Sequence, residues 1–190
     1  MIIDSHQHFW KYDSVRDSWI DDTMKIIQRD FLPADLEPVL KTNNVDGCIA
    51  VQADQSEQET EFLLDLAKNN KFIKGVVGWV NLSDTDVENR LKYFSQDTLF
   101  KGVRHILQAE KDDFMLDNWK TEDFTQYIDV IFEEFGAYRI MYGSDWPVCL
   151  LSGNYSKTKE IVTTYIKKLS SQEQQQVMGL NAIEFYGITI

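Results

Sequence analysis

Short apolar runs alternate with amphipathic stretches along the first 107 residues. Four runs have the length and β-branched content of buried strands: the start of MIIDSHQHFW, then VDGCIAV, FIKGVVGWVNL and FKGVRHIL. Between them, apolar positions recur at the spacing of one helix face in LPADLEPVLKTNN, SEQETEFLLDLAKNN and DTDVENRLKYFSQ. This alternation predicts a parallel sheet with helical crossovers. The runs lack polar alternation, which predicts strands that are covered on both faces.

Local signals place some of the helix starts. Pro33 lies near the start of the first helix, and Ser56 with Glu59 three residues later predicts a capping box at the second. A short helix is predicted at residues 23–28. Residues 108–120 are polar and irregular. The pattern then predicts a helix at 121–136, a strand at 139–147, and helices at 154–170 and 171–187, which gives five strands in all.

Composition excludes some classes of function. The 190 residues carry 31 acidic and 19 basic side chains, a net charge of −12, with no basic cluster longer than Lys167–Lys168. A nucleic-acid partner is therefore not expected. No apolar run approaches the ~20 residues that span a bilayer, and no leader peptide is evident. Cys48 and Cys149 lie in apolar stretches, as buried thiols do in a reducing compartment. A cytoplasmic protein is expected.

His6 and His8 are two of only three histidines, and they flank one residue at the end of the first predicted strand. Alternate strand residues point to the same face, so their Cα atoms would lie ~6.6 Å apart. Two imidazoles at that spacing can bind one divalent metal, and zinc suits them best. The alternative is a pair of hydrogen-bonded histidines without a metal.

Two other strand ends carry polar side chains. Asp145 lies near the end of the last predicted strand, where a carboxylate can bind a metal or act as a general base. The alternative is an aspartate that caps a helix or stabilises a turn, because the sequence GSDWP is also typical of turns. Arg104 and His105 end the fourth strand. The Arg104 guanidinium suits a substrate carboxylate or carbonyl, and a structural ion pair is its alternative. His105 has two interpretations: it contacts the substrate, or it is a buried histidine whose hydrogen bonds are satisfied within the protein.

Trp10 and Trp146 lie close to these strand ends and could wall a pocket for a ring-shaped ligand. Tryptophan is also the largest core residue, so core packing is the alternative for both.

Four stretches, DSHQHFW, KGVRHIL, IMYGSDWPV and NAIEFYG, occur in this order. Together they resemble the amidohydrolase superfamily, in particular its sugar-acid lactonases and 2-pyrone-4,6-dicarboxylate lactonases. The resemblance covers residues 1–107 and 119–187. It implies a (β/α)8 TIM-like barrel, α/β in class, that opens a lactone or related cyclic ester with water.

The resemblance also implies roles for residues. His6 and His8 match the first-strand pair that binds metal, and Asp145 matches the last-strand aspartate that activates water and contacts the ion. Arg104 matches a position near the substrate's carboxylate or carbonyl. From their places near the strand ends, and not from the resemblance, we expect Trp10, His105 and Trp146 to line the substrate pocket. Some members work without a tightly held metal, so the ion is not obligatory. A small lactone or carboxylate would be the ligand.

The chain departs from the family in length. Barrels of this type need ~250 residues, and five predicted strands fall short of eight. We interpret residues 1–190 as a single domain with an internal deletion near 116–119. A sequence stitched across a missing region, or a sheet closed by a second copy, are alternatives. Unpaired strand edges predict a homo-oligomer. A catalytically impaired or non-enzymatic remnant, or a metal-dependent decarboxylase, remain alternatives to a working lactonase.

Overall fold

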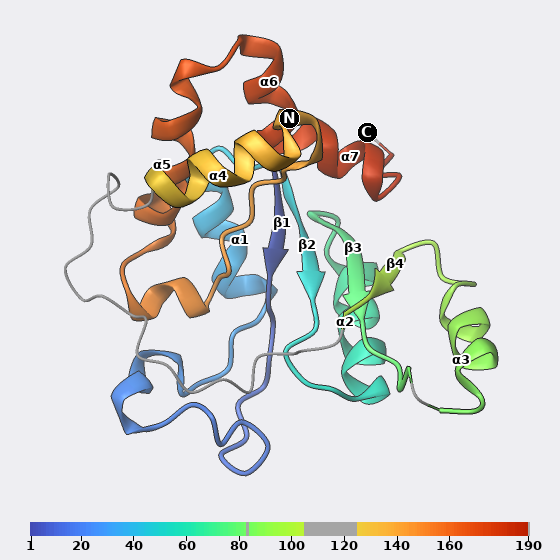
Figure 1. Ribbon diagram of the computed structural model, residues 1–190. Coiled ribbons are helices and arrows are strands. Elements are labelled where there is room, and N and C mark those ends of the chain that lie inside the picture. Colours follow the sequence, from blue (N-terminus) through green and yellow to red (C-terminus); the bar gives the residue numbers. More distant parts are fainter. Residues whose placement is uncertain (83, 105–124, 190) are drawn as a thin grey trace.

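A computed structural model describes residues 1–82, 84–104 and 125–189 (Figure 1). Its sheet has four parallel strands in the order β1-β2-β3-β4. Their bounds are β1 Ile3–Gln7, β2 Gly47–Val51, β3 Ile73–Gly78 and β4 Phe100–Val103. A strand is therefore confirmed within each of the four runs predicted for the first 107 residues, in parallel order, and residues 105–107 of the fourth run lie outside the described residues.

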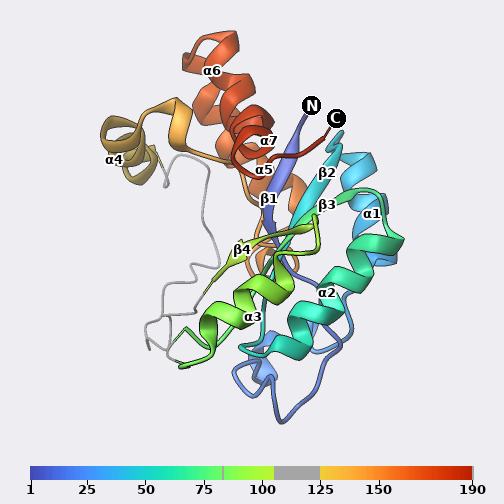
Figure 2. The same ribbon diagram turned by 90° about the vertical axis from the view of Figure 1, so that its right-hand side faces the viewer.

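One helix follows each of the first three strands: α1 Pro33–Thr42, α2 Glu57–Asn69 and α3 Val87–Phe94. Figure 2 shows α1 and α2 on one side of the sheet. A 3-10 helix at Asp22–Ile27 lies in the segment that links β1 to α1. The Ser56 hydroxyl accepts a hydrogen bond from the Glu59 N–H at 3.2 Å, which confirms the serine half of the predicted capping box.

The central strands are covered on both faces, as the unbroken apolar runs predict, but β4 at the edge of the sheet is only half-buried along its length. Every residue of β2 is buried. A large cluster that includes Cys48 and Ala50 fills the space between the sheet and the helices. A smaller cluster on the opposite face joins Ile3, Ile49 and Val51 to Ala182 of α7 (Asn181–Phe185). The polar ends of the strands are thus the part of the sheet left for chemistry.

The second part of the chain is largely helical. It contains α4 Thr125–Phe135, α5 Tyr155–Tyr165, α6 Ser171–Gln175 and α7, with 3-10 turns at Ala137–Arg139, Val148–Leu151 and Ile166–Lys168. The helix predicted at 171–187 is one helical stretch with a π-helical turn at Gln176–Leu180 between α6 and α7. No helix in the described ranges is long and apolar enough to cross a bilayer.

The strand predicted at 139–147 is wrong in form, although its position is right. The segment runs alongside β1 with a single parallel bridge between Gln7 and Trp146. Backbone N–H groups of Ser5 and His8 donate to the Tyr142 and Trp146 carbonyls at 2.9 and 2.7 Å. A regular ladder does not form because the backbone turns into the left-handed region at Asp145, where φ is +54°.

Glu59 carries a buried carboxyl that predicts a pH-dependent stability. It is 8 % exposed, and its side chain accepts the Ala53 N–H at 2.6 Å instead of closing the predicted capping box. Burial, with a smaller contribution from Asp54, raises its pKa to about 7, against the opposing effects of the Ala53 hydrogen bond and Arg16. The folded protein therefore binds this proton more tightly than the unfolded chain, whose glutamate pKa is ~4.3.

We expect the free energy of unfolding to fall as pH rises from about 4.5 to 7, because the stabilising proton is lost across that window. Glu59→Gln keeps an acceptor for Ala53 and cannot ionise. Between pH 5 and pH 8, the free energy of unfolding measured with urea should fall in both proteins. The fall should be smaller in the variant than in the wild type by on the order of 2–3 kcal/mol. The comparison isolates Glu59 from Asp4, whose raised pKa gives a slope of the same sign. Parallel curves would contradict this account.

Candidate active site at the carboxyl edge of the sheet

The predicted polar residues meet beyond the carboxyl ends of the parallel strands. In Figure 1 the arrows of β1, β2 and β3 point toward the segment that follows β1, and both termini lie at the opposite end. His6 belongs to β1, His8 follows it, and Asp145 comes from the segment beside β1. The sheet thus brings together residues that are far apart in the sequence.

Three side-chain atoms converge at this edge. The Nε2 atoms of His6 and His8 are 3.2 Å apart, and Asp145 Oδ1 lies 3.1 Å from His8 Nε2 and 3.6 Å from His6 Nε2. Ligands bound to one tetrahedral zinc at ~2.0–2.2 Å lie about 3.4 Å from each other. The donor set and its spacing therefore fit a divalent transition metal.

The ring orientation of His8 suits this use. Its Nδ1 is 2.8 Å from the Val51 carbonyl, which can only accept a hydrogen bond, so Nδ1 carries the proton. In this tautomer the Nε2 lone pair points toward His6 and Asp145. A backbone partner of this kind is the usual support of a metal-binding histidine.

His6 is held in its neutral form. Burial, with smaller contributions from the neighbouring His8 and Arg104 side chains, lowers its pKa to about 4 against the opposing effect of Asp145. A neutral imidazole at pH 7 has a lone pair free to accept a proton or bind a metal.

Arg104 lies at the end of β4 and reaches the same centre. Its Nη2 donates to the Gln52 carbonyl at 2.7 Å, and Gln52 Nε2 donates back to the Arg104 carbonyl at 3.0 Å. Its Nη1 lies 3.2 Å from His6 Nε2. Burial lowers the Arg104 pKa, but a guanidinium remains charged at neutral pH. Arg104 and a metal ion would therefore compete for one lone pair of His6.

Two pockets flank this centre, and Arg104 and Asp145 line both. The first, the Trp10 pocket, has a volume of about 510 Å³ and includes Trp10, Trp19 and Asp54 in its lining. The second, the Tyr186 pocket, has a volume of about 520 Å³ and includes His6, Met141 and Tyr186. The Asp145 side chain is 54 % exposed, so its carboxylate is accessible to a ligand or water.

Of the three side chains predicted to line the substrate pocket beside Arg104, the structure places only Trp10 in a pocket wall among the residues that it describes. Trp10 lines the Trp10 pocket and donates its indole N–H to the Arg29 carbonyl at 2.9 Å. Trp146 does not line either pocket: it is 2 % exposed and packs edge-to-face against Phe9 and Phe31 in the core. The indole is directed away from the centre that its neighbour Asp145 joins. His105 lies outside the described residues.

Sequence reasoning missed three residues that line the Trp10 pocket: Arg16, Trp19 and Asp54. Asp54 comes shortly after β2, so the strand-end rule that selected Asp145 could have found it. Arg16 and Trp19 lie in the irregular segment after β1, where no periodicity indicates which side chains turn toward the site.

The amidohydrolase family profile matches residues 3–117 and 114–188. The chain therefore belongs to the amidohydrolase family, and the family and class of enzyme predicted from its motifs, a hydrolase, are confirmed. An L-fucono-1,5-lactonase from Burkholderia ambifaria is 40% identical over 116 residues, which are 61% of this chain and 40% of that protein. Another from Burkholderia multivorans is 25% identical over 284 residues, 98% of this chain and 96% of that protein.

Solved structures confirm the fold class. A zinc-bound amidohydrolase from Burkholderia multivorans matches with a TM-score of 0.91 and 24% identity, covering 100% of both chains. A probable 2-pyrone-4,6-dicarboxylic acid hydrolase from Acinetobacter baumannii, with citric acid bound, matches with a TM-score of 0.61 and 12% identity over 98% of this chain and 99% of that one. The chain thus has a shortened amidohydrolase TIM-barrel fold.

Proposed function

We propose that this protein hydrolyses the lactone ring of a small sugar acid. The observation that carries the proposal is the convergence of Asp145 Oδ1 with both histidine Nε2 atoms, within 3.6 Å, between two pockets. The names of the two lactonase relatives support the choice of substrate class.

In the proposed reaction, Asp145 takes a proton from water as the water oxygen attacks the lactone carbonyl carbon. Arg104 donates hydrogen bonds to the carbonyl oxygen or to a substrate carboxylate, which stabilises developing negative charge. The bond from the carbonyl carbon to the ring oxygen then breaks, and the proton held by Asp145 passes to that oxygen. The product is an open-chain hydroxy acid, and Trp10 forms part of the wall around the ring.

We further propose that His6, His8 and Asp145 hold a divalent ion, zinc being the best fit to two imidazoles and a carboxylate. The spacing of the three donor atoms supports this, as does the zinc in the Burkholderia multivorans structure. When bound, the ion would polarise the carbonyl or the water as a Lewis acid.

The direct test measures zinc in the purified protein and then lactone turnover in a pH-indicator assay with L-fucono-1,5-lactone and other sugar lactones. We expect turnover, with up to one zinc per chain. Absence of turnover at every lactone, with or without added zinc, would overturn the proposal. Absence of both metal and turnover would favour a non-enzymatic remnant of the barrel.

We propose that residues 1–190 form one domain that lacks a middle block of the barrel near 116–119, a position outside the described residues. The alignment with the Burkholderia multivorans lactonase supports this, since it extends over 284 residues and this chain has 190.

The free thiols of Cys48 and Cys149 support our proposal that the protein resides in the cytoplasm.

A homo-oligomer is part of the same proposal. The outer edge of β4 pairs with no other strand in the part of the chain that the structure describes, and an unpaired edge favours association. We expect light scattering to give a mass that is a multiple of 22.2 kDa. A monodisperse species of 22.2 kDa would contradict it.

A further inference from the structure

Asp4 is a buried carboxylate of β1 that has no place in the reaction described above. It is 0 % exposed and lies two residues before His6. Its Oδ1 accepts the backbone N–H groups of His6 and Ser144 at 3.2 and 2.9 Å. Its Oδ2 accepts the hydroxyls of Ser144 and Tyr155 at 2.5 and 2.9 Å. A carboxylate with this many donors is satisfied without water, and it links three separate parts of the chain.

Ser144 continues this network to the far side of Asp145. Its hydroxyl donates to Asp4 Oδ2 and accepts the Trp146 N–H at 3.1 Å. Ser144 is 0 % exposed, so solvent does not replace these bonds. The backbone on both sides of Asp145 is therefore tied to one buried carboxylate.

The conformation of Asp145 needs such support. Its φ of +54° lies in the left-handed region, which non-glycine residues seldom adopt unless their surroundings impose it. The preceding Gly143 lies so close to β1 that a Cβ there would be 2.7 Å from the His6 Cβ. The Asp145 N–H donates to the His6 carbonyl at 2.8 Å, so the turn at residues 143–146 packs directly against β1, the strand that carries His6.

We propose that Asp4 is a positioning residue which, through the Ser144 hydroxyl, holds Asp145 in the orientation that faces His6 and His8. This inference rests on the proposed function of Asp145. The same carboxylate fixes the His6 backbone, so a single group sets the relative positions of the histidine strand and the aspartate turn.

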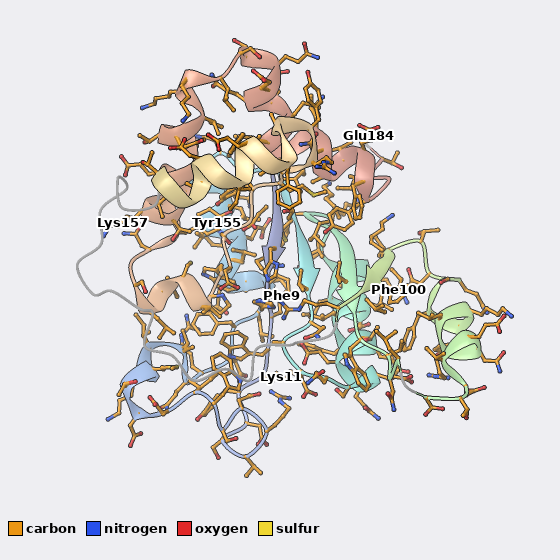
Figure 3. All side chains as sticks on the ribbon, in the orientation of Figure 1. Phe9, Lys11, Phe100, Tyr155, Lys157 and Glu184 are labelled. Atoms are coloured by element: carbon orange, nitrogen blue, oxygen red, sulfur yellow. The ribbon has the colours of Figure 1, made fainter. Side chains whose placement is uncertain are left out.

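Tyr155 provides a matched comparison for Ser144. It is the first residue of α5, and its hydroxyl contacts Asp4 Oδ2 as the Ser144 hydroxyl does. In Figure 3, Tyr155 lies to the left of β1, on the side opposite β2, and Phe9 lies near the carboxyl end of that strand. Tyr155 lies outside the 143–146 turn, so a purely structural role for the network predicts similar effects from the loss of either hydroxyl.

The test compares Ser144→Ala with Tyr155→Phe by steady-state kinetics, zinc titration and thermal unfolding. For Ser144→Ala we expect kcat to fall roughly 10- to 100-fold with KM within about threefold of the wild type, and zinc affinity to fall about 10-fold. For Tyr155→Phe we expect kcat and zinc affinity within about twofold, with the melting midpoint lowered by a few degrees. If Ser144→Ala folds poorly, Ser144→Cys replaces it in the test, because the thiol fills the position of the hydroxyl but is only a weak hydrogen-bond donor. We expect the same losses of kcat and zinc affinity in the cysteine variant.

Equal losses of kcat in the serine and tyrosine variants would overturn the positioning role. Wild-type protein without lactone turnover would instead count against the proposed function, and the inference would then be decided by the crystal structure of Ser144→Ala. We expect the Asp145 carboxylate to leave its 3.1 Å contact with His8 in that structure. Retention of the contact would overturn the inference whatever the activity.

Discussion

Asp145→Asn is expected to lower kcat for lactone hydrolysis by roughly 10³-fold, because an amide cannot take the proton of the attacking water. The change is nearly isosteric, and the side chain is 54 % exposed, so the fold should persist. The measurement is initial rates in a pH-indicator assay, with circular dichroism to confirm that the variant is folded.

The assay should contain excess zinc, so that weaker metal binding by the amide is separated from loss of the base. Asp22→Asn makes the same chemical change at an exposed position in the Asp22–Ile27 helix, away from both pockets, and should hydrolyse at the wild-type rate. If Asp145→Asn retains wild-type turnover, water activation by Asp145 is wrong, and the reaction needs a different base.

The first half of the fold was predictable because each βα unit is local in the sequence. The strand at 139–147 was predicted only in position. Its partner, β1, lies more than 130 residues away, and Ser144 uses its hydroxyl for Asp4 and Trp146 while Asp145 turns out of the ladder. Periodicity reports which residues are apolar, but it does not report where a buried carboxylate will replace regular pairing.

The candidate site was predictable where strand geometry determines it. Alternation along a strand places His6 and His8 on one face, and the shared edge of parallel strands brings Asp145 and Arg104 to them. Trp146 follows Asp145 directly, and its ring turns into the core, so proximity in sequence was a poor guide. Asp4 did leave a signal, a charged residue within a buried strand, but its partners are visible only in three dimensions.

His6→Ala is expected to weaken zinc binding by at least 100-fold. It removes one of three donor atoms, and loss of a group that only supports a ligand already costs 10- to 100-fold. His6 is the better choice of the two histidines, since its side chain is 38 % exposed, whereas His8 is buried and contacts the Val51 carbonyl. Isothermal titration of metal-free protein with zinc measures the affinity without any assumption about the reaction.

Arg104→Met is the informative contrast for this titration. It removes the guanidinium that lies 3.2 Å from His6 Nε2 and would both repel the ion and compete for the same lone pair. At an effective dielectric constant of ~20, like charges about 4 Å apart repel by roughly 4 kcal/mol per unit charge pair, before solvent and salt reduce the effect. Arg104→Met should therefore bind zinc as tightly as the wild type or more tightly, while His6→Ala binds it poorly. If His6→Ala keeps wild-type affinity, the ion binds elsewhere and the three converging side chains serve proton transfer alone.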